Sequence, residues 1–378
     1  MKKSFFMLLL SMLCTLSYGQ DTNSELLKKL VEKEILTQDE ADEIQRESTL
    51  EKQEDTFTKT TEKIKETFSS PYAQFGGYGL FLYKYNDIAK VKHTAEPRVI
   101  FLSLSGELGS NIRYYILGEV VDPMLFEFYG EWTPVKAFGL KAGQMKTPLS
   151  MENQISLTGL ETVSYTRSVS NLTGMAGDVL VGRLTNNNAG RDIGIRVAGS
   201  TKNDLLCYAL GLYQGTGINT AENNNSKDLA GSLIFQPIKG FRIGGSAYWG
   251  EAHYTKPGDT EIGDHVRNRW VLSSEYKSDR FYARTEWITG NDGGTDKEGL
   301  YGTALWYFIP KKFNTVAKVD YYNRNKDVNS EVMDYTLAVN YYFYKQCRLQ
   351  LNYVYSDYSK DWETRNTNLV LGQLQVVF

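Results

Sequence analysis

The fold is decided by the last residues of the chain, Asn368-Leu369-Val370-Leu371-Gly372-Gln373-Leu374-Gln375-Val376-Val377-Phe378. Counted back from Phe378, every second residue is apolar or small, and the residues between them are partly polar. Successive side chains of a β-strand point to opposite faces, so this segment is predicted to be a strand with one apolar and one wetter face. A soluble sheet rarely ends on such an unprotected strand. A transmembrane barrel needs one, because its last strand pairs with its first to close the wall.

From Pro71 onward the chain divides into segments of about ten residues with alternating polarity, which is typical of membrane strands. The sixteen predicted strands are 72–85, 98–108, 111–121, 124–132, 136–145, 190–199, 204–213, 228–236, 239–250, 267–277, 280–289, 299–309, 312–323, 332–344, 346–356 and 366–378. These segments predict an all-β fold, a 16-stranded antiparallel transmembrane β-barrel.

The connectors between these strands alternate between tight turns and longer segments. The longer connectors are predicted at 86–97, 146–189, 214–227, 251–266, 290–298, 324–331 and 357–365, and the short Asp122-Pro123 breaks the pattern. Periplasmic turns that alternate with longer outward loops produce this arrangement in an outer-membrane barrel. With sixteen strands, both ends of the barrel domain are expected in the periplasm.

The region before the barrel differs in composition from the rest of the chain. Residues 1–19 are predicted to be a cleaved signal peptide, because two lysines precede an apolar run and a small-residue cleavage site. Residues 20–70 are predicted to be a periplasmic helical arm, with a capping box at Thr37-Gln38-Asp39-Glu40. Leu50, Phe57 and Ile64 recur every seven residues, which favours a self-associating coiled coil; a solvated linker helix is the alternative. Residues 71–378 are the predicted barrel domain.

Charge and reactive residues exclude several classes of function. The chain has a net charge of −3, of which the arm contributes −6 from 14 acids and 8 bases. The signal adds +2, so the barrel carries +1, and such a weak charge gives no support for nucleic-acid binding. Cys207 and Cys347 lie in distant predicted strands, and neither a metal site, a disulfide nor a cofactor is expected. His93, His253 and His265 fall in separate predicted outward loops without a nucleophile motif, so no enzyme is predicted.

Three segments carry a resemblance to a known family. They are Gly143-Gln144-Met145-Lys146-Thr147-Pro148-Leu149-Ser150-Met151-Glu152, Tyr165-Thr166-Arg167-Ser168 and Arg191-Asp192-Ile193-Gly194-Ile195. In this order, residues 71–378 resemble the phosphate-selective porin O and P family of outer-membrane channels. The resemblance implies a 16-stranded barrel in the outer membrane of a Gram-negative bacterium, usually trimeric, that passes phosphate or other small anions. The expected partners are therefore outer-membrane lipid, small hydrophilic solutes and two further copies of the chain.

The resemblance also implies that the third loop, 146–189, folds into the barrel and narrows it. Charges in such a narrow, poorly screened space choose which ions pass. The residues expected at the constriction or at an anion site are Lys141, Lys146, Arg167, Arg183 and Arg196. The residues expected on the pore wall are Arg242, Arg284, Lys318 and Arg348. Because a charge on the lipid side costs about 2–4 kcal/mol near the midplane, wall charges are placed inward; for each, an ion pair with a neighbouring acid is the alternative role.

The function expected from these observations is passive diffusion of small hydrophilic solutes, with a mild preference for anions such as phosphate. A general or oligosaccharide-preferring pore, whose tyrosines offer stacking surfaces, is the alternative within the channel class. A non-conducting structural barrel anchored through the arm is the alternative from another class.

Overall fold

The computed structural model describes residues 69–180, 189–256, 258–328, 330–362 and 364–378, together with Lys33 and Thr37. The chain divides into two compact units, Met1–Phe68 and Ser69–Phe378, and the second is described below. The predicted signal peptide and, apart from four of its residues, the predicted helical arm lie outside the described residues. Ser69 and Ser70, which the arm prediction included, form a short strand instead, because they pair with the first strand of the wall.

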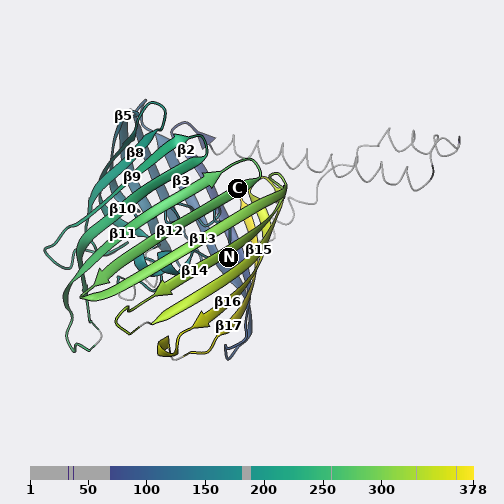
Figure 1. Ribbon diagram of the computed structural model, residues 1–378. Helices are drawn as coiled ribbons and strands as arrows, with labels where there is room; N and C mark the ends of the chain where they lie inside the picture. The colour runs from purple at the N-terminus through teal and green to yellow at the C-terminus, as the bar shows by residue number, and fades with distance from the viewer. Residues whose placement is uncertain are drawn as a thin grey trace, which may run out of the picture. The chain divides into compact units, whose positions relative to one another are not determined.

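The described unit is built almost entirely of strands (Figure 1). They are β1 (Ser69–Ser70), β2 (Ala73–Asn86), β3 (His93–Glu107), β4 (Ile112–Glu119), β5 (Met124–Val135), β6 (Phe138–Lys146), β7 (Arg191–Ser200), β8 (Leu206–Tyr213), β9 (Asp228–Ile238), β10 (Phe241–Tyr254), β11 (Gly263–Lys277), β12 (Phe281–Asp292), β13 (Thr295–Ile309), β14 (Phe313–Asn323), β15 (Glu331–Tyr344), β16 (Cys347–Tyr358) and β17 (Thr367–Val377). The short helix α4 (Arg167–Leu172) and the 3₁₀ turn η1 (Lys360–Trp362) complete the described elements. Within the described residues, none of the helices is both long and apolar enough to cross a membrane.

The sixteen strands β2 to β17 form one closed antiparallel sheet. Each strand pairs with its neighbours in sequence, and β17 pairs with β2. The seam extends to the last residue, because Phe378 and Gly77 exchange two backbone hydrogen bonds of 3.0 Å. The C-terminal strand therefore closes the wall, and the predicted 16-stranded antiparallel barrel is confirmed.

The two faces of the wall follow the predicted alternation. In β17, Leu374 and Val376 are exposed on the outer face, whereas Gln373 and Gln375 are buried inside. In β10, Ile243 is exposed on the outer face and Arg242 lies on the inner one. The outer face is thus apolar and the inner face polar, as a lipid-embedded barrel requires.

The strand boundaries depart from the prediction mainly at one rim. The connectors predicted at 86–97, 251–266 and 290–298 shrink to 87–92, 255–262 and the pair Gly293-Gly294. The three histidines, expected in outward loops, lie in the ends of β3, β10 and β11. The apolar alternation stops in these segments, but the antiparallel hydrogen-bond ladder continues into polar residues, since backbone pairing does not require apolar side chains.

Deleting Phe378 is expected to weaken the closed barrel. The deletion removes both hydrogen bonds to Gly77 and the ring that lies against the Gly77 backbone, where an added Cβ would stand 2.8 Å from the ring carbons. An unpaired seam leaves backbone groups without partners in lipid. We expect the unheated protein to lose its compact electrophoretic form at a lower temperature than wild type. Phe378→Leu, which keeps the backbone bonds, should fall between the two.

Candidate functional site

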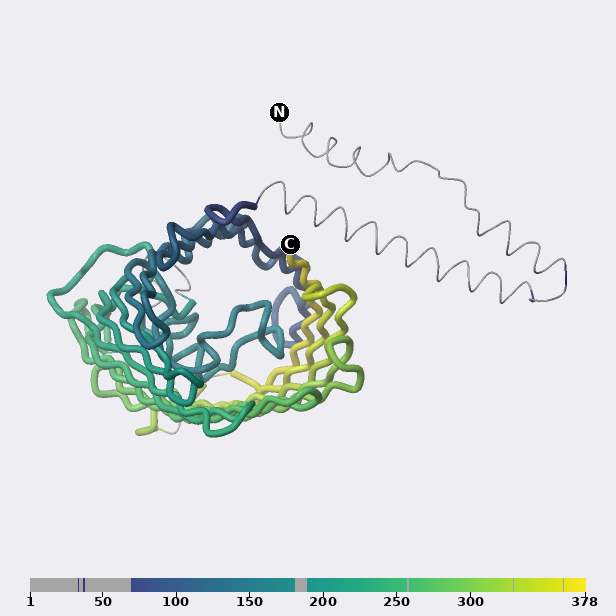
Figure 2. The backbone as a smooth tube through the Cα atoms, turned by 90° about the horizontal axis from the view of Figure 1, so that it is seen from above, coloured from purple at the N-terminus to yellow at the C-terminus, as the bar shows by residue number. Residues whose placement is uncertain are grey.

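A single long segment occupies the interior of the barrel. Residues 147–190 connect β6 to β7, and we call the described part of this connector, residues 147–180 and 189–190, the inner loop. Figure 2 shows this segment lying inside the ring of strands. Its helix α4 packs against β12, β13 and β14. Apolar side chains from the inner loop are fully buried, among them Leu149, Leu160, Val169 and Leu172, so the loop has a core of its own against the wall.

Buried ion pairs fasten the inner loop to the strands beneath it. Arg284 on β12 contacts Glu152 at 3.1 Å and Glu161 at 2.9 Å, and its side chain is fully buried. Glu152 also accepts a hydrogen bond from the backbone N–H of Thr166 at 2.9 Å. One guanidinium therefore holds two separate parts of the loop on the wall. Arg284, expected to face the pore, has a structural role in these contacts.

A second fastening point holds the far part of the inner loop. Asp178 accepts two hydrogen bonds from Arg267, at 3.1 and 2.8 Å, and lies 3.6 Å from Arg269. Both arginines project from β11, and Arg269 also pairs with Asp292 at 2.8 Å. Burial on its own would raise the pKa of Asp178, but Arg267 and Arg269 outweigh it and hold this pKa below its usual range. The carboxylate thus stays charged, and the pair stays formed, well into acidic solution.

The helix of the inner loop is attached through its first residue. Arg167 donates to both oxygens of Asp334 on β15, at 2.7 and 2.9 Å. The backbone N–H of Arg167 and the hydroxyl of Ser168 donate to Asp320 on β14. The Nε and Nη2 groups of this guanidinium are therefore directed at the wall. The contacts favour anchoring, rather than anion capture, as the role of Arg167.

Four further cations hold backbone carbonyls of the inner loop. Arg348 donates to Leu160 at 2.8 Å, Lys318 donates to Ser164 at 3.1 Å, and Lys146 donates to Asn153 at 2.7 Å. Arg98 donates to Val163 at 2.7 Å and was not among the predicted residues. It is the first residue of the predicted strand 98–108, and only the fold of the inner loop brings Val163 to it. Arg98, Lys318 and Arg348 make no ion pair with any described acid, and their donors go to carbonyl, hydroxyl and amide oxygens instead.

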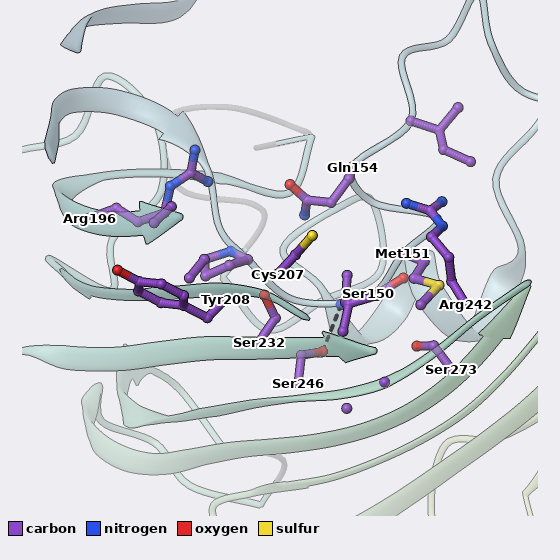
Figure 3. Close-up of a pocket in the computed structure, with 17 residues that line it drawn as sticks. Ser150, Met151, Gln154, Arg196, Cys207, Tyr208, Ser232, Arg242, Ser246 and Ser273 are labelled. Carbon is purple, nitrogen blue, oxygen red and sulfur yellow. Dashed lines mark hydrogen bonds between the residues drawn. The ribbon is translucent and has the colours of Figure 1, made fainter. Parts of the chain in front are cut away.

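A cavity of about 430 Å³ remains between the inner loop and strands β7 to β11 (Figure 3). The inner loop contributes Ser150, Met151 and Gln154 to its lining, and the Ser150 N–H donates to Ser246 at 3.0 Å. The wall contributes several serines and two arginines, Arg196 and Arg242, which lie on opposite sides of the cavity in Figure 3. Among the described residues that line this cavity, none has a carboxylate side chain.

The two arginines differ in how their charge is balanced. Arg242 donates to Glu275 on β11 through Nε at 3.0 Å, and its side chain remains 40% exposed. Arg196 forms no ion pair with a described residue; its Nη1 donates weakly to the Lys146 carbonyl at 3.3 Å, and its buried Nε has no acceptor in the described part of the chain. Arg196 therefore presents an unbalanced positive charge to the cavity.

Lys141 stands beside Arg196 on the neighbouring strand, since the two residues are paired in register. Its ammonium group lies 3.5 Å from Glu131 and 3.9 Å from the centre of the Tyr129 ring. This lysine is thus balanced by one acid and one aromatic ring.

The predicted cations consequently separate into groups. Arg196 and Arg242 line the cavity from opposite sides, and Lys141 lies beside Arg196. Lys146, Arg167, Arg284, Lys318 and Arg348 are directed to the inner loop or its anchors. Arg183 lies outside the described residues. The face of each strand could be predicted from the sequence, but whether a cation meets the loop or the cavity depends on the path of the loop.

A closed sixteen-stranded barrel with an apolar exterior and a loop folded into a charged interior defines an outer-membrane channel of the porin class. The phosphate-selective porin O and P family matches residues 82–267 and 251–378. The chain belongs to this family and is a porin. The family and the fold point to a channel rather than an enzyme, and to the outer membrane as its location.

Solved structures show the same fold at low sequence identity. The anion-selective porin from Comamonas acidovorans matches with a TM-score of 0.61 and 11% identity, covering 81% of this chain and 99% of that one. The trimer form of in-vitro folded OmpT from Vibrio cholerae matches with a TM-score of 0.59 and 10% identity, covering 81% and 99%. OmpF from Salmonella typhi, in complex with daunomycin, matches with a TM-score of 0.58 and 10% identity, covering 81% and 97%. No curated protein sequence matches this chain.

Proposed function

We propose that this porin passes small hydrophilic solutes passively and prefers anions, with the cavity at Arg196 and Arg242 as the selective region. The observation that carries the proposal is a cavity lined by two arginines and, in the described residues, by no carboxylate. A cation must cross this region against an unfavourable potential, whereas an anion exchanges part of its hydration for guanidinium donors. Phosphate and other oxyanions fit the planar donor fork of arginine best.

Conductance in a planar bilayer tests this function. Discrete current steps are expected for the purified protein, and the reversal potential in a potassium chloride gradient should have the sign of an anion-preferring pore. Added phosphate should reduce the chloride current, because phosphate occupies the arginine-lined cavity. A cation-preferring reversal potential would contradict the proposed selectivity, and a barrel without current steps would favour a structural role.

An oligosaccharide-preferring pore is the second candidate, and one observation favours it. The rings of Tyr115 and Tyr129 lie 5.6 Å apart on the inner face of β4 and β5, and half-buried rings of this kind stack on sugar faces. Neutral oligosaccharides that block the current at lower concentration than phosphate does would favour this candidate over the anion channel.

Cys207 offers an independent measure of the potential in the cavity. It lines the cavity and is partly exposed, whereas Cys347 is buried. We expect a negatively charged, water-soluble methanethiosulfonate to modify Cys207 several-fold faster than a positively charged reagent of similar size, because the arginines concentrate anions. Block of the current after reagent addition reports the rate. Cys207→Ser should abolish the block; equal rates for the two reagents would count against anion preference.

The finer features of assembly belong to the same proposal. We infer a homotrimer, since the neighbours of this fold include a trimer form of OmpT. Export by a signal peptide at 1–19 and a helical arm at 20–70 that adds coiled-coil contacts between protomers remain predictions. Chemical cross-linking of the full chain in native outer membranes is expected to give a three-chain product, and a product limited to one chain would contradict the trimer.

A further inference from the structure

The two rims of the barrel differ in charge. The tight turns lie at the rim that carries the C-terminus (Figure 1). We call this set the basic rim, and it comprises residues 108–111, 136–137, 201–205, 239–240, 278–280, 310–312 and 345–346. These turns hold seven basic and two acidic residues, a net charge of +5. The connectors of the opposite rim, the inner loop aside, hold eight basic and eight acidic residues, a net charge of zero.

The basic side chains of this rim are exposed and mostly without acidic partners. Lys136 pairs with Asp204 at 2.8 Å, and each side chain of this pair is about half exposed. The remaining cations are Lys202, Lys239, Arg280, Lys311, Lys312 and Lys345, and none of them forms an ion pair with a residue of the described unit. Within the described unit, the charge of these six side chains is therefore not neutralised by an ion pair.

Two of these lysines occupy positions where the backbone favours glycine. Lys311 has a φ of 61° and follows Pro310 in a turn closed by a 3.0 Å hydrogen bond from Lys312 N–H to Ile309. Proline followed by a residue with positive φ is the pattern of a type II turn, whose third position favours glycine or asparagine. Lys345 has a φ of 43° in the two-residue turn between β15 and β16. A lysine at such positions costs about 1–2 kcal/mol of strain, which suggests a use for its charge.

Exposed aromatic and apolar side chains on the outer wall stand directly beside these cations. Phe138 follows the turn of Lys136, Ile238 precedes Lys239, Phe308 and Ile309 precede Lys311, and Phe343 precedes Lys345. Aromatic residues at the edge of an apolar belt mark the level of lipid headgroups. Since the turns are only two to five residues long, their ammonium groups lie at that same level.

We propose that the basic rim binds anionic phospholipid headgroups, such as those of phosphatidylglycerol, in the periplasmic leaflet of the outer membrane. The inference rests on the proposed function for the placement of the barrel in that membrane. A surface of +5 beside an apolar belt attracts phosphates, and each lysine near an anionic membrane contributes a favourable, salt-sensitive interaction. Peptidoglycan, an acidic polymer that could also meet this rim, lacks the acyl chains that would contact the neighbouring aromatic belt.

Tryptophan quenching by brominated lipids tests the proposal on the full chain in vesicles. Trp306 is exposed on the outer wall toward the basic rim, and Trp249 is exposed toward the opposite one. In variants that keep one tryptophan each, with phenylalanine at the others, quenching by brominated phosphatidylglycerol is compared with that by brominated phosphatidylcholine. We expect Trp306 to report an enrichment of phosphatidylglycerol of at least about threefold at low salt that disappears at high salt, and Trp249 to report none.

The variant that lowers the net charge of the basic rim from +5 to +1 combines Lys136→Gln, Lys239→Gln, Lys311→Gly and Lys345→Gly. The two glycine replacements relieve backbone strain, so this variant is expected to fold as well as wild type. In this variant the enrichment of phosphatidylglycerol over phosphatidylcholine at Trp306 should fall to about one. The control variant Lys90→Gln with Lys92→Gln, on the opposite rim, should keep the wild-type enrichment. Equal quenching by the two lipids in wild type, or enrichment that survives in the rim variant, overturns the proposal. The proposal is also overturned if the wild-type protein, but not the rim variant, sediments with peptidoglycan while neither shows enrichment of phosphatidylglycerol.

Conductance of the same preparations separates this proposal from the channel function. If the protein carries no current but still enriches phosphatidylglycerol, only the channel function is contradicted. If it carries a normal anion current but does not enrich phosphatidylglycerol, only the lipid site is contradicted.

Discussion

Replacing Arg196 and Arg242 together with glutamine is expected to abolish the anion preference of the pore. Each charge lies at the lining of the same cavity, and a unit charge a few ångströms from a permeating ion changes its energy by about 1–3 kcal/mol at the effective dielectric of a partly solvated site. The variant also leaves Glu275 without its cationic partner, which adds a negative charge to the region. The chloride-to-potassium permeability ratio, obtained from reversal potentials, should fall at least about fivefold and invert.

The control for this experiment removes two charges elsewhere. Lys90→Gln with Lys92→Gln acts in the exposed connector 87–92 and should leave the ratio close to wild type. Arg167→Ala discriminates between two roles of Arg167. If Arg167 anchors the inner loop, the variant should have an unstable single-channel current; if Arg167 binds anions, the variant should have a changed chloride-to-potassium permeability ratio. A double variant at Arg196 and Arg242 that retains the wild-type ratio would remove this cavity as the selective region.

Replacing Arg284 with methionine is expected to release part of the inner loop. The substitution leaves Glu152 and Glu161 at a buried position without their common cation, and breaking one side of a buried ion pair costs about 3–5 kcal/mol. We expect a loop that leaves the wall intermittently, seen as frequent brief changes in single-channel current, and a lower temperature of barrel unfolding in detergent. The Asp178 contacts with Arg267 and Arg269 should keep the far part of the loop attached.

The matched control breaks an exposed pair of similar chemistry. Lys136→Met disrupts the contact with Asp204 at the rim, where an ion pair contributes about 1 kcal/mol or less. Quiet currents and an unchanged unfolding temperature in Arg284→Met would show that the buried pair does not hold the loop. The triple variant with Glu152→Gln and Glu161→Gln should recover part of the stability, because it removes the uncompensated charges.

Local patterns carried most of the information about the wall. The alternation in 366–378 predicted β17 and its inner face within a residue or two at each end, because a period of two is visible within one strand. The same logic placed Arg196, Arg242 and Lys318 on the inner face. It failed at 290–298, where β12 and β13 continue to a two-residue turn, since polar strand ends beyond the lipid have no apolar alternation to reveal them.

The sequence by itself determined that this chain is a closed, lipid-facing barrel, which of its residues face inward and, through short motifs, the family to which it belongs. Only the tertiary structure decided what the inward charges do. Arg284 and Arg167 neutralise acids of the inner loop and the wall, whereas Arg196 faces a cavity without a described acid partner. The reason is physical: strand periodicity is a local property of the backbone, but the balance of each charge depends on contacts between residues more than a hundred positions apart.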